Sequence, residues 1–182
     1  GGWLGGGGTT RVWFNSVSMS GNRGFATGRG FALAIGDSTN PMDVRNNLLV
    51  TTQTSSGTAT HAIGIVEGGS FASLTSNYND LYSASTPLAM VGGLSTPQGQ
   101  TVADLAAWRT RTGEDAASIS ADPLYQTNGN LHITSALSPA ANIGQPIAGV
   151  TTDVDGESGS RTTLPDLGAD EFITWSLATA VV

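Results

Sequence analysis

The chain has 182 residues, of which 38% are hydrophobic and 12% are charged, so it is long enough for one domain with one sizeable core. Its seven basic residues are all arginine and its net charge is −7, which excludes nucleic acid and anionic membrane surfaces as expected partners. Cysteine is absent, so disulfides and thiolate metal sites are excluded, and no apolar run approaches the roughly 20 residues of a membrane span.

A glycine-rich arm, residues 1–10, is followed by two interleaved series of short apolar strands. The first series recurs about every 32 residues and consists of FNSVSM (14–19), RNNLLV (45–50) and NYNDLY (77–82). The second series consists of GFALAIG (30–36), HAIGIVEGG (61–69) and PLAMVGG (87–93), and glycine ends each of its strands. The two series have nearly the same period, so they indicate one repeating unit that contains two or more strands.

A period of this length, with glycine, serine, threonine and asparagine turns, is typical of a solenoid whose coils stack on one another. The sequence therefore predicts an all-β solenoid of three to four coils. Asn15, Asn47 and Asn79 occupy the same place in the three first-series strands, and we expect their side chains to stack into a ladder. The alternative is a β-sandwich, whose strands recur about every 8 to 12 residues.

The segment TVADLAAWRTRTG (101–113) has the pattern of one short helix. Thr101 and Asp104 make a capping-type start, two arginines fall in the last turn, and Gly113 stands where a helix commonly ends. The pattern predicts a helix over about 101–112 that lies outside the coils.

The segment 151–172 contains six of the 14 acidic residues around a single arginine, Arg161. We interpret it as a cap that closes the C-terminal side of the coils. Arg161 is expected to bridge carboxylates such as Asp166 or Asp170. The apolar side chains expected to fill the last coil are Leu164, Leu167 and Phe172.

Calcium binding is the alternative interpretation of this segment. An EF-hand loop needs glycine at its sixth position and glutamate at its twelfth, and DVDGESGSRTTL has serine and leucine there. A looser calcium site made of Asp153, Asp155 and Glu157 stays open, and no other metal or cofactor is assigned. His61 and His132 are about 70 residues apart without a neighbouring ligand pattern, so neither is assigned as a metal ligand.

The run ADLAAWRTRTGEDAASISADPLY, followed by GNLHITSALSPAANIG and DVDGESGSRTTLPDLGADEF, resembles the C-terminal part of bacterial right-handed parallel β-helix proteins of the pectate-lyase-like superfamily. The resemblance covers about residues 40–172. It implies a right-handed parallel β-helix over 11–172, packing of Trp108 against the coils, and a secreted or cell-surface location. Lyases, hydrolases, adhesins and structural proteins share this scaffold, so the resemblance leaves the function open.

Three functions are compatible with these features. The first is a structural module of a secreted bacterial surface protein, whose copies associate head-to-tail into filaments through the arm and the apolar tail, 173–182. The residues expected at such a contact are Trp3, Leu4, Ile173, Trp175 and Leu177. The second is a carbohydrate-binding adhesin module, with Trp13, Tyr78 and Tyr82 against a polysaccharide. The third is a divergent polysaccharide lyase or hydrolase, although no catalytic residue is assigned because lysine is absent and the acids outside 151–172 are scattered singly.

Overall fold

The computed structural model describes residues 8–25, 27–36, 39–66, 70–85, 87–94, 99–157 and 161–172. The regular structure of this part of the chain is β-strand, mostly in parallel sheets, apart from one helix of eight residues. No helix in these segments has the length and apolarity needed to cross a bilayer.

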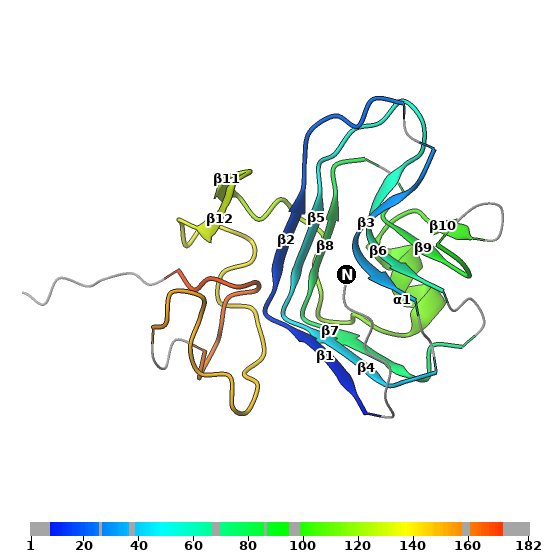
Figure 1. Ribbon diagram of the computed structural model, residues 1–182. Helices are drawn as coiled ribbons and strands as arrows, with labels where there is room; N and C mark the ends of the chain where they lie inside the picture. Colours follow the sequence, from blue (N-terminus) through cyan, green and yellow to red (C-terminus); the bar gives the residue numbers. More distant parts are fainter. Residues whose placement is uncertain are drawn as a thin grey trace, which may run out of the picture.

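Three sheets of parallel strands face one another around a common interior (Figure 1). The chain passes through the sheets in the same order three times, and each passage is called a coil below. The coils contain β1 (Thr10–Trp13), β2 (Ser16–Met19) and β3 (Gly30–Ile35); β4 (Met42–Arg45), β5 (Leu48–Thr51) and β6 (Thr60–Ile65); and β7 (Leu74–Asn77), β8 (Asp80–Ser83) and β9 (Ala89–Val91). Each strand pairs with its equivalent in the next coil, which gives the orders β1-β4-β7, β2-β5-β8 and β3-β6-β9.

The predicted spacing of 32 residues is the register of the first two sheets. Asn15 and Asn47, at the start of β2 and β5, are joined across 32 positions, and Ser16 lies opposite Leu48. The third sheet has shorter spacings, since Phe31 lies opposite His61 in β6. The loops that lead into this third sheet therefore absorb the variation in coil length.

A tight bend separates the first two strands of every coil. Its residue is Phe14, Asn46 or Tyr78, and these three have left-handed φ values of 53°, 59° and 55°. A non-glycine residue in this region costs about 1 kcal/mol or more, so the surrounding contacts have to hold each bend in place. The next residue in each coil is the asparagine that the sequence predicts to form a ladder.

The interior between the sheets is filled by apolar side chains. Leu49, Ile63 and Leu81 come from the second and third coils and are at most 1% exposed. β5 is buried on both faces, because Leu49 points into this interior while Leu48 and Val50 point outward and belong to a second apolar cluster. Something must therefore cover the outer face of the sheet β2-β5-β8.

β10 (Gln100–Val102) and α1 (Leu105–Thr112) follow the third coil. The prediction of a helix from about 101 is wrong at its start, because 100–102 pairs antiparallel with β9 and is therefore extended. Asp104 is the helix N-cap, and its Oδ1 accepts a hydrogen bond of 2.8 Å from the backbone N–H of Ala107.

The helix packs into the end of the interior and does not lie wholly outside it. Trp108 is fully buried within the interior cluster, which confirms the expectation that it packs against the coils. Gly113 ends the helix with φ of 78°, as the sequence predicts. Residues 115–119 then add a short further rung, in which the backbone N–H of Ile119 donates to Asn79 O at 2.8 Å. This end of the coils is covered.

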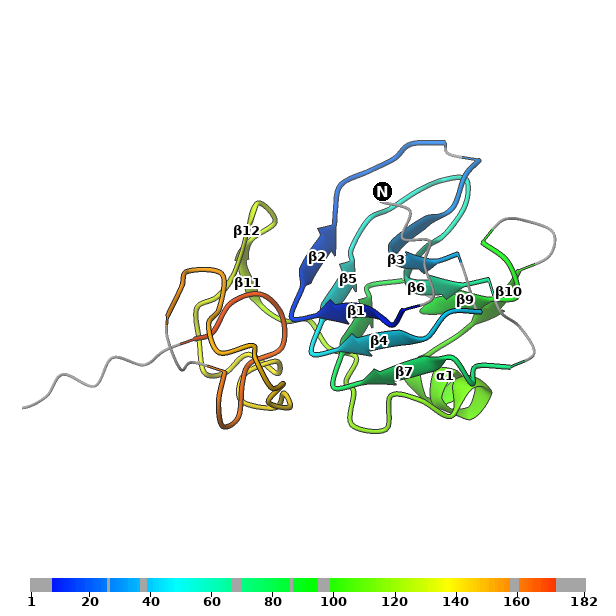
Figure 2. The ribbon, with the colours of Figure 1, turned by 60° about the horizontal axis from the view of Figure 1, so that its bottom comes forward.

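The C-terminal module, residues 122–172, lies beside the coils against the outer face of β2-β5-β8 (Figures 1 and 2). Its regular structure is a hairpin of β11 (Tyr125–Thr127) and β12 (Asn130–Ile133), and the rest is loop. The apolar contact between module and sheet consists of Leu48, Val50, Ile133, Ala140 and Leu167, with Tyr78, Tyr82, Ile119, Tyr125, Ile143 and Phe172 around it.

The predicted position of the cap is therefore wrong: residues 151–172 cover the side of a sheet and do not close the C-terminal side of the coils. The physical reason is that the outward side chains of β5 are apolar and would be exposed to water without the module. The C-terminal end of the coils is already covered by the helix. Gly168 makes the close approach possible, because a Cβ there would lie 2.6 Å from Leu48 Cδ1 and 2.5 Å from Ser16 Oγ.

Candidate functional site

The ladder of Asn15, Asn47 and Asn79 runs along the bends of the three coils. In each step one Oδ1 accepts two hydrogen bonds from the asparagine of the preceding coil. The backbone N–H and Nδ2 of Asn15 donate to Asn47 Oδ1, both at 3.0 Å. Those of Asn47 donate to Asn79 Oδ1 at 3.0 and 2.9 Å. The predicted ladder is confirmed, and its two inner members are fully buried.

At the C-terminal end the ladder is closed by residues that are not asparagine. The backbone N–H of Asn79 donates to Ser118 Oγ at 2.8 Å, and its Nδ2 donates to Asp115 Oδ1 at 3.1 Å. Trp108 Nε1 donates to the other carboxylate oxygen of Asp115 at 2.7 Å. Ser118 and Asp115 thus each accept one of the two bonds that the next asparagine would accept in a longer ladder, and Trp108 of the helix holds Asp115 in place.

At the N-terminal end the ladder is open. Asn15 Oδ1 occupies the place where Asn47 and Asn79 each accept two bonds, yet it has no donor in the described part of the chain. Asn15 is exposed. An acceptor with this geometry fits a backbone N–H and a second donor from one more rung.

The strands around Asn15 are edge strands. β1, β2 and β3 each end their sheet on the same side of the molecule. Within β2, Asn15 O and Met19 O accept bonds from β5, so the backbone groups of Ser16 and Ser18, which alternate with these residues, point away from β5. The first-coil face, defined here as the outer edges of β1, β2 and β3 with Asn15, therefore presents backbone groups that have no partner among the described residues and can template a further strand.

Two charged residues next to this face, Arg45 and Asp43, form an ion pair. Arg45 donates to Asp43 from Nε at 2.7 Å and from Nη2 at 2.6 Å. Burial raises the pKa of Asp43, but the hydrogen bonds and the positive charge of Arg45 outweigh it and leave the pKa below its ordinary value. The guanidinium groups of Arg11 and Arg45 lie 5.5 and 5.6 Å from the Trp13 ring. Two arginines and one aspartate leave this group with a single net positive charge, which does not oppose contact with a neutral strand.

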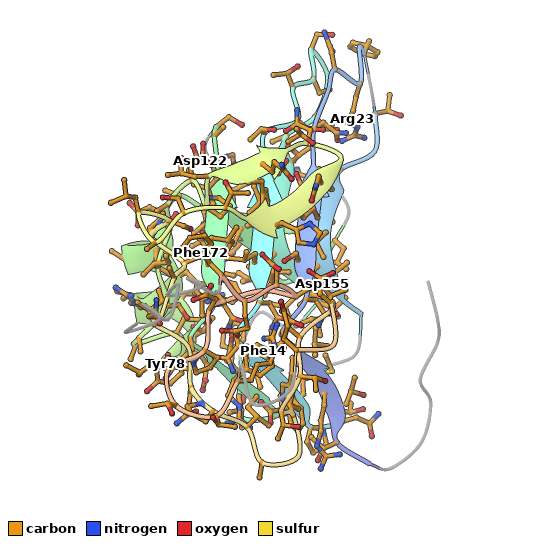
Figure 3. All side chains as sticks on the ribbon, turned by 90° about the vertical axis from the view of Figure 1, so that its left-hand side faces the viewer. Phe14, Arg23, Tyr78, Asp122, Asp155 and Phe172 are labelled. Atoms are coloured by element: carbon orange, nitrogen blue, oxygen red, sulfur yellow. The ribbon has the colours of Figure 1, made fainter. Side chains whose placement is uncertain are left out.

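A buried arginine joins the module to the bend of the first coil. Arg161 is 2% exposed, and its guanidinium lies 4.1 Å from the centroid of the Phe14 ring (Figure 3 labels Phe14 beneath the module). Its Nη1 donates to Gly168 O at 3.0 Å and lies 3.5 Å from Glu171 Oε1. Burial raises the pKa of Glu171 to about 7, even though the backbone N–H of Asp166 and Arg161 favour its charged form.

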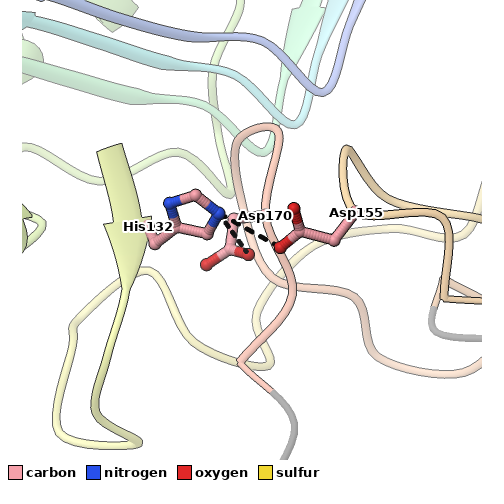
Figure 4. Close-up of side chains that lie close together, drawn as sticks. All are labelled: His132, Asp155 and Asp170. Atoms are coloured by element: carbon pink, nitrogen blue, oxygen red, sulfur yellow. Dashed lines mark hydrogen bonds and ion pairs between the residues drawn. The ribbon is translucent and has the colours of Figure 1, made fainter. Parts of the chain in front are cut away.

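The module also brings together side chains that could hold a metal ion. One group is His132, Asp155 and Asp170, and the other is Asp153, Asp155 and Glu157; in each group the ligand atoms lie within 4.8 Å of one another. A cavity of about 440 Å³ adjoins the first group and is lined by Gln126, Asn130, His132, Ile133, Thr134, Glu157, Asp170, Glu171 and Phe172. Figure 4 shows His132 facing both aspartates.

The predicted cap residues behave differently from one another. Asp166 and Asp170 accept backbone bonds rather than direct bonds from Arg161: Asp166 takes the N–H groups of Asn142 and Phe172, and Asp170 takes that of Ile133. Leu167 is fully buried and Phe172 packs beside it, whereas Leu164 is 59% exposed and fills no part of the core, contrary to expectation.

The aromatic residues considered for glycan contact do not share one surface. Tyr78 and Tyr82 pack against the cluster between module and sheet, so part of each ring is used inside the fold. Trp13 lies on β1 between two arginines. The residues expected at an assembly contact, Trp3, Leu4, Ile173, Trp175 and Leu177, lie outside the described residues.

Sequence reasoning missed the closure of the ladder by Asp115 and Ser118, and it passed over His132 as a metal ligand. The signal for the first lies in the spacing, since Ser118 follows Asn79 by 39 positions, close to one coil. No spacing rule relates His132 to Asp155 and Asp170, which are 23 and 38 positions away on separate loops.

Comparisons with family models, with curated proteins and with solved structures found no match for this chain. The resemblance to the pectate-lyase-like superfamily therefore stays a prediction from sequence.

Proposed function

We propose that the three coils are turns of a right-handed parallel β-helix, and that the chain is a structural module of a secreted or cell-surface bacterial protein. The repeated order of strands through three parallel sheets and the uninterrupted ladder support the β-helix. The sequence resemblance supports the location.

Copies of the chain associate through the first-coil face. The observation that carries this proposal is the asymmetry of the ladder: it is closed at Asp115 and Ser118 but open at Asn15 Oδ1, on the same side where three sheets have their edges. The first coil is also less buried, because β2 is only half-buried where β5 is fully buried. A strand laid on this face would satisfy backbone groups and remove apolar surface from water, at about 25 cal/mol per Å².

The occupant is a strand from another copy. The tail ITWSLATAVV (173–182) is apolar, uncharged and rich in strand-forming residues, and such a segment can add to an exposed sheet edge. A tail that adds to the face of the next copy makes a contact between unlike surfaces. Such a contact extends into a filament unless its rotation happens to close a ring.

Sedimentation velocity over about 1 to 100 μM tests the proposal, and a matched pair of variants makes it specific. Ser18→Pro removes an outward N–H of β2 and leaves the bonds of Asn15 and Met19 to β5 in place, whereas Ser18→Ala removes only the hydroxyl. The wild type and Ser18→Ala are expected to form larger species as concentration rises, and Ser18→Pro to remain near the monomer mass of 18.5 kDa.

Deletion of residues 173–182 is expected to give the same result as Ser18→Pro. The melting temperature of each variant shows whether the coils are intact. A wild type that stays monomeric at 100 μM, or a deletion that assembles as well as the wild type, contradicts the proposal.

A further inference from the structure

The orientation of the His132 ring is fixed from its own strand. Asn130 Oδ1 accepts a hydrogen bond of 3.2 Å from the backbone N–H of His132 and lies at hydrogen-bond distance from His132 Nδ1. An amide oxygen can only accept, so Nδ1 carries the ring proton. In the neutral ring, the lone pair is then on Nε2 and points away from the hairpin.

His132 Nε2 meets two carboxylate oxygens. Asp155 Oδ2 lies 3.1 Å from it and Asp170 Oδ1 lies 4.0 Å from it (Figure 4). Asp170 is only 6% exposed, and its Oδ2 is already used by the backbone N–H of Ile133 at 2.7 Å. Its Oδ1 has no hydrogen-bond donor in the described part of the chain and faces the imidazole. In the neutral ring, three lone-pair atoms therefore face one another, and a cation bound among them would offset their mutual repulsion.

We propose that His132, Asp155 and Asp170 bind a divalent transition-metal ion, with zinc as the reference ion. One imidazole nitrogen with two carboxylate oxygens suits zinc and its neighbours in the first transition row, whereas calcium and magnesium prefer oxygen ligands alone. Tetrahedral ligands about 2.1 Å from zinc lie about 3.4 Å apart. The His132–Asp155 separation of 3.1 Å is close to that value, and the exposed Asp155 can turn to adjust it.

The adjoining cavity leaves room for solvent on the open side of the ion. A site with three protein ligands and an open position has the coordination of zinc centres that keep a water ligand. The ion would also join β12 to the loop at 153–157 and to the segment that carries Asp170. The metal site lies in the module on the outer face of β2-β5-β8, whereas the proposed assembly uses the edge strands of the first coil.

Calorimetric titration of chelator-treated protein with zinc chloride and, separately, calcium chloride tests the site. Zinc is expected to bind at one site per chain, and calcium to bind at least tenfold more weakly. His132→Gln and Asp155→Asn are each expected to weaken zinc binding at least about tenfold, the lower limit for losing even an outer-shell partner. Glu157→Gln removes a ligand from the acidic group only, so it is expected to weaken zinc binding less than either of these two substitutions.

A spectroscopic measurement separates ligation from a general effect on folding. The chain has two histidines, and His61 is fully buried in β6 against the Phe31 ring, so it serves as an internal reference. Zinc is expected to shift the Nε2 resonance of His132 in ¹⁵N NMR and to leave that of His61 unchanged. No shift at His132, zinc binding unaffected by His132→Gln, or loss of binding in Glu157→Gln alone overturns the proposal.

Discussion

The coils and the C-terminal module both pair their buried polar groups, but they use different kinds of partner. In the coils the partners come from equivalent positions one coil away, as in the bonds from Asn15 to Asn47 and from Asn47 to Asn79. In the module, carboxylates accept hydrogen bonds from backbone N–H groups. One arginine, Arg161, contacts the ring of Phe14, which is far from it in the sequence. Repetition makes the first region regular and extendable. The second region depends on individual charged side chains, so single substitutions and pH should affect it selectively.

The largest effect is expected in the ladder. Asn47→Ala removes the acceptor of two bonds from Asn15 and leaves Val12 O without the donor that Asn47 Nδ2 supplies at 2.8 Å. Each buried polar group left unpaired costs about 1 to 3 kcal/mol, so the free energy of unfolding should fall by about 4 kcal/mol. Urea denaturation followed by circular dichroism measures it. Asn15→Ala is the control at the exposed end of the ladder and should cost less than half as much.

The next effect concerns the link between the two regions. Arg161→Ala leaves the buried Glu171 without its ion pair and the Phe14 ring without its cation, and should destabilise the protein by about 3 kcal/mol. The loss should persist in excess chelator. Hydrogen exchange should show increased exposure of 122–172 while the amides of β5 and β8 stay protected. Uniform loss of protection in both regions would mean that the module and the coils unfold as one unit.

The third effect is a dependence of the free energy of unfolding on pH, and it comes from Asp80 on the sheet that the module covers. Asp80 is fully buried on the outward face of β8, and burial raises its pKa from 3.8 to about 7. Between pH 4 and 7 the folded state therefore holds a proton that the unfolded state has lost, so this group makes stability fall as pH rises through that window.

Asp80→Asn keeps the acceptor for the N–H of Ala121 and removes the ionisation. The variant should match the wild type near pH 4 and exceed it by roughly 3 to 4 kcal/mol at pH 8, because each unit of the pKa difference corresponds to about 1.4 kcal/mol. Unfolding curves at pH 4, 6 and 8 test this. A difference between the two proteins that is the same at all three values would show that Asp80 does not titrate in this range.

The smallest effect is expected for the ion pair beside the first-coil face. Arg45→Ala breaks two bonds to Asp43, but both side chains are partly exposed, so the loss should stay below about 1 kcal/mol. Thermal unfolding at low and high salt measures it, and Arg45→Lys shows whether the paired geometry matters. A loss as large as that of Asn47→Ala would mean that the coils also depend on individual charges.

The repeating region could be predicted from the sequence because its contacts have a constant spacing. Asparagine at intervals of 32 residues in the first series of strands predicted the ladder. Trp108 and Gly113 marked the helix and its end, although the start of the helix was misplaced because Thr101 pairs with Met90 in a strand.

The module could not be predicted in the same way, because its contacts have no period. Ser16 Oγ accepts a hydrogen bond from the backbone N–H of Ala169, which is 153 positions away. The sequence near either residue gives no pattern that predicts this contact. The acidic character of 151–172 was visible, but its position on β2-β5-β8 depends on the outward apolar side chains of β5. A run such as LLV indicates burial without indicating that it occurs on both faces.

Amide hydrogen exchange in β2, measured at about 1 μM and about 100 μM, tests the central claim most directly. The N–H groups of Ser16 and Ser18 point away from β5, whereas that of Val17 points toward it. If the first-coil face receives a strand from another copy, Ser16 and Ser18 should exchange rapidly at low concentration and become protected at high concentration, with Val17 protected at both. Rapid exchange of Ser16 and Ser18 at both concentrations would contradict the account.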